Sequence, residues 1–407
     1  MKTKIILIII LGLFSNSFQN LHAQVNDVQL YGFVHSLIDH ALPINPIPNN
    51  ETATPYWVND IAQSTTNTFA FTGQFGQIPN HVDNLPPSDN LGYSGVASPW
   101  DSSTGQTFSG SDINTIIVTA ANFIQWVLPT NPDPSDAMGR SIVDNTVTLF
   151  DWTNNEKPNM RYYIYGNWPE MNTASAFPPT VPTQAEIDDF HNTTIGNTGI
   201  FNNWWTQYQD AYIAQRPLLN AKLIPVGRII SQIYTQVLPS SIPFDELYED
   251  SAPHGRANTY FLAGLITYIA LYEQQVPATY MPSNIIHSTI RNNLTTINNF
   301  IWQELNDFNF PNGESRVFYS NVLSINDENI KISNIFPNPV VNKFRIKSNS
   351  SETFSISVIN INGTLIMSYD NIRNNDTIDI SNLNSGVYFI RLTNSENESI
   401  VKKMIKK

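Results

Sequence analysis

The stretch Asn114-Thr115-Ile116-Ile117-Val118-Thr119-Ala120 decides the fold class of this chain. It is nearly all apolar and rich in β-branched residues, which favour the pleated strand. A strand without polar alternation is typical of a sheet that is covered on both faces, as parallel sheets are. The stretch therefore predicts the centre of a mostly parallel sheet.

Further strands and helices alternate on either side of this strand. Additional strands are expected at 28–34, 68–72, 160–166 and 221–227, and helices are expected at 135–152, 203–215, 228–237 and 256–274. Strands that alternate with helices indicate βαβ crossovers. We therefore expect an α/β body with helices on both faces of the sheet. In such a sheet, ligands bind at the carboxyl ends of the strands.

The N-terminal segment, residues 1–23, is expected to be a signal peptide. Lys2 and Lys4 precede an apolar run at 5–14, and the small residue Ala23 stands at the expected cleavage point. The run is about 10 residues long, whereas a membrane-spanning helix needs about 20. We therefore expect no transmembrane segment in the mature protein.

Several spaced motifs mark the C-terminal end. They are Asn334-Ile335-Phe336-Pro337-Asn338-Pro339, then Asn384-Ser385-Gly386-Val387-Tyr388, and the basic end Val401-Lys402-Lys403-Met404-Ile405-Lys406-Lys407. Together they resemble the type A C-terminal sorting domain of proteins exported by type IX secretion. The short strands and the tight turn at Asn362-Gly363 fit a small β-sandwich.

This resemblance implies a localisation and a partner. We expect export through the periplasm to the cell surface or the medium, with the type IX secretion machinery as the partner of the tail. The expected layout after the signal peptide is a hydrolase-like body at 25–323, a linker at 324–334 and the sorting domain at 335–407. Any activity is then expected in the body.

Composition excludes several functions. The net charge is −13, and residues 25–325 hold 9 Lys and Arg against 26 Asp and Glu. An acidic body argues against a nucleic-acid partner, since phosphate contacts need Lys and Arg. The absence of cysteine rules out thiol nucleophiles and thiolate metal sites. Aromatic residues make up 12%, and they fit either sugar binding or core packing.

Five residues follow the expected strands or precede the last helix in an informative order. They are Ser36, Gly73, Asn122, Asp250 and His254. This order resembles the SGNH (GDSL-like) hydrolase family over about 28–275. The family is a flavodoxin-like α/β/α sandwich with a parallel sheet, and it acts mostly on carboxylic esters, many of them acetyl esters of carbohydrates.

The resemblance implies a role for each residue. Ser36 is expected to be the nucleophile, activated by His254 as the base, with Asp250 orienting the imidazole. Gly73 and Asn122 are expected to complete the oxyanion hole together with the backbone N–H of the serine.

The sequence departs from the family pattern at two of these positions. The chain reads Val34-His35-Ser36 where the family has Gly-Asp-Ser, and Asp250 stands four residues before the histidine instead of three. Glu249 or Asp245 is therefore an alternative acid, and Gly76 is an alternative to Gly73. His35 is expected to form a pocket wall, and Trp168 and Glu170 are expected to line the pocket.

The hypothesis is a secreted serine esterase that hydrolyses carboxylic esters, with acetyl esters on polysaccharide as the expected substrates. No metal and no cofactor is expected, since the acidic residues and histidines lack ligand spacing. The alternative is a non-catalytic carbohydrate-binding or surface protein on the same scaffold. A metal-dependent hydrolase is a third, weaker interpretation.

Overall fold

The computed structural model describes residues 25–40, 49–120, 127–196, 201–239, 241–319, 332–348, 353–360, 365–393 and 399–407. These residues fall into two units, one within Gln24–Ser320 and one within Asn321–Lys407. The expected signal peptide and Asn122 lie outside the described residues. The strand β6 begins at Ile332, inside the segment expected as linker.

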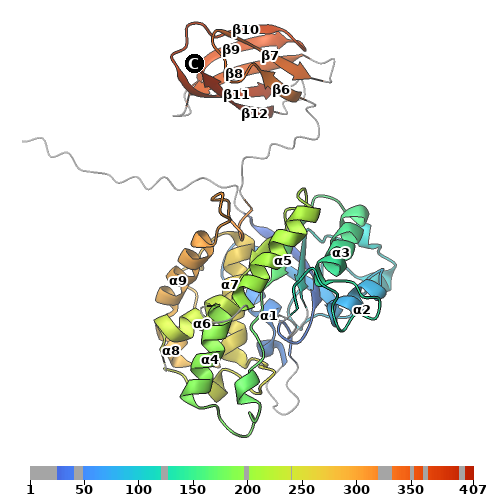
Figure 1. The fold of residues 1–407 in the computed structure, drawn as a ribbon, viewed down its shortest axis with the longest axis vertical. Helices are drawn as coiled ribbons and strands as arrows, with labels where there is room; N and C mark the ends of the chain where they lie inside the picture. The colour runs from blue at the N-terminus through green and yellow to red at the C-terminus, as the bar shows by residue number, and fades with distance from the viewer. Residues whose placement is uncertain are drawn as a thin grey trace, which may run out of the picture. The chain divides into compact units, whose positions relative to one another are not determined.

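A parallel sheet forms the centre of the first unit (Figure 1). Its strands are β1 Asp27–Val34, β2 Thr68–Phe75, β3 Thr115–Thr119, β4 Arg161–Tyr165 and β5 Lys222–Ile224. They lie in the order β2-β1-β3-β4-β5, and every neighbouring pair is parallel. This is the flavodoxin-like order, whose connections change direction between β1 and β3. The predicted fold class is confirmed, and ligand binding is expected beyond the carboxyl ends of β1 and β3.

Helices cover both faces of the sheet (Figure 1). The α-helices are α1 Thr54–Gln63, α2 Ile78–Asp83, α3 Ile142–Glu156, α4 Gln184–Ile195, α5 Phe201–Gln215, α6 Val226–Gln232, α7 Ala257–Tyr272, α8 Ser288–Asn292 and α9 Leu294–Asp307, with a π-helical turn at Ile233–Val237. Helices α1 and α7 pack together on one face, while α3 packs against α2 and α5 on the other. Among the described residues, no helix is long and apolar enough to cross a membrane.

Two helices differ from expectation for local reasons. The helix predicted at 135–152 begins only at Ile142, because Ser141 and Asp144 form a capping box that fixes its first turn. Helix α1 was not predicted, since the proline-rich segment before it indicated a loop. Pro55 occupies the first turn of α1, where a missing N–H costs nothing.

The core of the first unit is unusually aromatic. Trp57, Trp168 and Trp204 are at most 2% exposed, and Trp205 is 4% exposed. The packing interpretation of the aromatic residues is therefore confirmed for these four. Aromatic side chains of this size bury about 150–250 Å² each, so they contribute a large part of the hydrophobic stabilisation of the fold.

The C-terminal unit consists of two antiparallel sheets. One has the order β10-β7-β6 and the other has the order β12-β11-β8-β9. The strands are β6 Ile332–Phe336, β7 Lys343–Ser348, β8 Phe354–Asn360, β9 Leu365–Ile372, β10 Thr377–Asp379, β11 Gly386–Thr393 and β12 Ser399–Lys406. Their inward residues, including Phe344, Ile356 and Ile390, share one buried cluster. Two antiparallel sheets with a shared core are the arrangement of the predicted β-sandwich.

Candidate active site

Ser36 lies just beyond the carboxyl end of β1, in a turn that several contacts hold in place. The N–H groups of Ile38 and Asp39 both donate to the His35 carbonyl, at 2.9 and 3.3 Å. The Tyr260 hydroxyl, on α7, donates to the Ser36 carbonyl at 2.5 Å. The serine is therefore fixed between the end of a central strand and a buried helix, with its side chain half-buried.

His254 lies in a closed loop that leads into α7. Tyr248 and Gly255 form an antiparallel bridge at the base of the loop. The N–H of Glu249 donates to the His254 carbonyl at 2.9 Å. Beneath the loop, the indole N–H of Trp168 donates to the Pro253 carbonyl at 2.8 Å. The loop is thus supported from the sheet side before any substrate binds.

The structure brings Ser36, His254 and Asp250 together. The Ser36 Oγ lies 3.0 Å from His254 Nε2, and His254 Nδ1 lies 2.7 Å from Asp250 Oδ2. Because an ionised carboxylate only accepts, the ring must carry its proton on Nδ1, and Nε2 is then free to accept from the serine hydroxyl. Both imidazole edges are engaged in the geometry of a serine–histidine–acid triad.

The four-residue spacing of Asp250 and His254 has a structural explanation. Asp250 Oδ1 accepts the backbone N–H groups of Ala252 and His254, each at 3.0 Å. The carboxylate therefore caps the loop that it begins, and its other oxygen reaches the ring. Burial opposes ionisation, but the hydrogen bonds from the ring and backbone of His254 hold the pKa of Asp250 below its usual value.

The other acids considered from the sequence do not reach His254 in this way. Glu249 lies next to a different ring, with Oε1 2.5 Å from His40 Nε2. Asp245 is exposed, in the short 3₁₀ turn Phe244–Glu246.

The expected oxyanion donors have different outcomes. Gly73 lies inside β2, paired with Gly32, and its N–H donates to the Leu91 carbonyl at 3.1 Å. The predicted oxyanion role of Gly73 does not fit this geometry. Gly76 is no substitute, since its N–H donates to the Val34 carbonyl at 2.8 Å. Asn122 lies outside the described residues, so its role stays a prediction.

One donor remains beside the nucleophile. Among the described residues, no acceptor is found for the backbone N–H of Ser36. A backbone N–H at the nucleophile itself is well placed for the oxyanion that forms when its hydroxyl attacks a carbonyl.

His35 is a structural residue of the turn. It is 1% exposed, its Nε2 donates to the Ala120 carbonyl at 2.8 Å, and its Nδ1 accepts the N–H of Leu37 at 3.2 Å. Burial lowers the pKa of His35 to about 4, so the ring is neutral. It joins the end of β1 to the end of β3, and its expected place in a pocket wall stays a prediction. Trp168 is likewise buried below the loop, while Glu170 is exposed.

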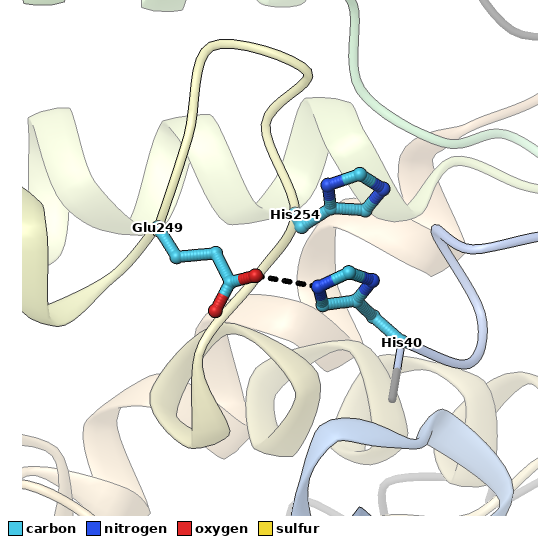
Figure 2. Close-up of side chains that lie close together, drawn as sticks. All are labelled: His40, Glu249 and His254. Atoms are coloured by element: carbon cyan, nitrogen blue, oxygen red, sulfur yellow. Dashed lines mark hydrogen bonds and ion pairs between the residues drawn. The ribbon is translucent and has the colours of Figure 1, made fainter. Parts of the chain in front are cut away.

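A second histidine, which the sequence did not single out, lies against His254. The rings of His40 and His254 are stacked, with centroids 3.8 Å apart and planes 12° apart (Figure 2). Burial and the neighbouring His254 lower the pKa of His40. His40 and Glu249 are 209 residues apart in the chain, so no local pattern could have revealed the pair.

His40, Glu249 and His254 are also the described residues whose ligand atoms gather within 4.8 Å of one another. These residue types suit zinc. However, lone pairs of stacked rings run parallel and do not converge on one point, and both nitrogens of His254 already have partners. A metal at this place would have to break the triad geometry.

Residues 334–407 match the family model of the secretion system C-terminal sorting domain. The tail is therefore a type IX sorting domain, and it directs the protein through the periplasm to the cell surface or outside. The predicted localisation and the predicted partner of the tail are confirmed. No curated protein matches the chain.

Similarity to solved structures is weak. A crystal structure of a DUF4886 family protein from Bacteroides uniformis covers 72% of this chain and 98% of its own, at 10% identity and a TM-score of 0.42. PorZ, a surface component of the type IX secretion system of Porphyromonas gingivalis, covers 22% of this chain and 13% of its own, at 12% identity and a TM-score of 0.17. The function of the body therefore has to be argued from its own residues.

Proposed function

We propose that the body is a secreted serine esterase that hydrolyses carboxylic esters through an acyl-enzyme on Ser36. The observation that carries this proposal is the continuous line of hydrogen bonds from Asp250 to His254 to the Ser36 hydroxyl, at 2.7 and 3.0 Å. Ser36 comes from the turn after β1, while Asp250 and His254 come from the loop before α7. The three side chains meet beyond the carboxyl end of a central parallel strand.

The geometry supports a two-step reaction. In the first step, His254 Nε2 accepts the Ser36 proton while Oγ attacks the ester carbonyl, and the Ser36 N–H donates to the resulting oxyanion. The imidazolium then returns the proton to the leaving alcohol. In the second step, a water molecule gives a proton to Nε2 and attacks the acyl carbonyl. The bond to Ser36 Oγ then breaks with release of the acid, and the imidazolium returns the proton to Oγ. Asp250 stays ionised throughout and stabilises the imidazolium.

The substrate class follows from the resemblance and from the location. An extracellular esterase of this type meets acylated polysaccharides, and the tail exports this protein to that compartment. We therefore propose acetyl esters on carbohydrate as the substrates to test first, with p-nitrophenyl acetate as the general reporter.

Hydrolysis of p-nitrophenyl acetate by the full chain tests the proposal. We expect turnover that is lost in Ser36→Ala and His254→Ala, persists in the exposed-serine control Ser109→Ala, and survives a chelator. A fluorophosphonate should transfer its phosphonyl group to Ser36 Oγ, with loss of fluoride, in the wild type and in Ser109→Ala but not in Ser36→Ala. Absence of both turnover and labelling would favour the non-catalytic surface protein, for which glycan binding is then the assay. Loss of activity with the chelator would favour a metal-dependent hydrolase.

A further inference from the structure

Two carboxylate–imidazole pairs are stacked at the candidate active site. In one layer Asp250 binds His254, and in the next layer Glu249 binds His40 with Oε1 2.5 Å from Nε2. Figure 2 shows the two rings one above the other, with the Glu249 carboxylate at the edge of the His40 ring. Consecutive residues of one loop thus serve two parallel rings.

We propose that the Glu249–His40 pair positions His254 for the reaction, a role that rests on the esterase function proposed above. The flat ring of His40 covers one face of the His254 imidazole and restricts its rotation, so that Nε2 stays aimed at Ser36. Neither residue of the pair touches the reacting atoms, so both are positioning residues.

The burial of the pair supports this role. The side chains of His40 and Glu249 are 16% and 15% exposed, about as enclosed as His254 at 19%. Burying a carboxylate destabilises the fold unless the carboxylate is hydrogen-bonded. Here Glu249 is hydrogen-bonded to His40, the ring that stacks on His254. The hydrogen bond orients His40 so that its face, and not its edge, meets His254.

The charges near the rings add an electrostatic component. His254, Glu249 and Asp250 are the titratable groups that act on His40. Burial and His254 favour the neutral form of His40, whose Nε2–H is donated to Glu249. A neutral ring can lie against the imidazolium that forms on His254, whereas a charged ring at 3.8 Å would repel it. Protonation of His40 in acid should therefore oppose proton transfer from Ser36.

Three variants test the pair in the full chain. His40→Ala removes the stacked ring, and we expect kcat to fall about tenfold or more with KM nearly unchanged, since a loss of orientation acts on the chemical step. His40→Phe keeps a flat ring and should recover most of kcat. Glu249→Gln removes a negative charge beside the rings, and we expect the acid limb of kcat/KM to move to lower pH.

The matched control is His287→Phe, because His287 lies 4.0 Å from Glu246 in a histidine–carboxylate pair outside the triad. We expect wild-type kcat and pH profile for it. Wild-type kcat in His40→Ala, or equal losses in His40→Ala and His40→Phe, would overturn the inference.

A second readout separates this inference from the esterase proposal. The ring-proton resonances of His254, followed by NMR, should move downfield in His40→Ala, because the ring current of the stacked His40 is lost. An inactive wild type would remove the esterase assignment alone, and the chemical shifts would still decide whether His40 covers the His254 ring. Identical chemical shifts in the two proteins would overturn the inference.

Discussion

Asp250 binds His254 at two places, the ring Nδ1 at 2.7 Å and the backbone N–H at 3.0 Å. One carboxylate therefore both closes the loop and orients the imidazole at its end. This double contact is why a spacing of four residues serves where the resemblance led us to expect three. The two oxygens of Asp250 have different roles, because Oδ1 accepts from the backbone of the loop and Oδ2 binds the ring.

Asp250→Asn should preserve the loop and damage the chemistry. The amide oxygen still accepts the backbone N–H groups of Ala252 and His254, but an amide in place of the carboxylate no longer holds the required tautomer or stabilises the imidazolium. We expect kcat to fall by about 10⁴ with a nearly unchanged melting temperature. Asp245→Asn is the control, since Asp245 is exposed. The reverse result, an active Asp250→Asn and an inactive Asp245→Asn, would assign the acid to Asp245.

Asn122 remains the predicted side-chain donor of the oxyanion hole. Gly73 and Gly76 donate their N–H groups to the carbonyls of Leu91 and Val34, so we expect the Ser36 N–H and the Asn122 side chain to be the donors to the oxyanion. Asn122→Ala should lower kcat by about 10² to 10³ and leave KM little changed. Steady-state kinetics beside an Asn131→Ala control checks this. An unchanged kcat would remove Asn122 from the mechanism.

The strands were predictable for a physical reason, whereas the meeting of Ser36 with His254 was expected from the resemblance to the SGNH family. Hydrophobic runs identify buried strands, and the carboxyl ends of parallel strands share one edge. The oxyanion role expected of Gly73 does not fit the observed geometry, because the hydrophobic pattern alone does not tell a strand interior from a strand end. Gly73 pairs with Gly32, and a Cβ at Gly73 would lie 2.4 Å from the Gly32 carbonyl oxygen.

The remaining features depend on tertiary contacts. Helix α1 gains its stability from packing on α7, which no local propensity reveals. The His40–Glu249 pair joins residues with no sequence relation. Asp250 rather than Glu249 binds His254 because of the direction in which each side chain points from the 248–255 loop. The hydrogen bonds within the loop fix those directions.

The contact between α1 and α7 predicts a severe effect at Gly264. A Cβ at this position would lie 2.4 Å from the Trp57 Cβ, an atom that cannot swing away because it is fixed to the backbone of α1. Gly264→Ala should therefore lower the free energy of unfolding by about 1–3 kcal/mol, despite the better helix propensity of alanine. Gly92→Ala is the control, since nothing lies within 4 Å of its Cβ. Urea denaturation measures both, and equal stability of Gly264→Ala and the wild type would contradict the close packing.

Glu273, which follows the last residue of α7, should make stability depend on pH. Burial raises the pKa of Glu273 to about 7, and the carboxyl accepts the N–H of Tyr319 at 3.0 Å. The unfolded chain has its ordinary pKa of about 4.3. The folded state therefore holds the proton more tightly, and the stability from this group is present below the unfolded pKa and is lost as pH rises through about 7. Glu273→Gln mimics the protonated form, so its melting temperature should exceed that of the wild type increasingly from pH 5 to pH 8, whereas the exposed control Glu170→Gln should follow the wild type. A Gln variant that is less stable at pH 8 would mean that the charges of Arg161 and Lys222, which favour the ionised form, outweigh burial.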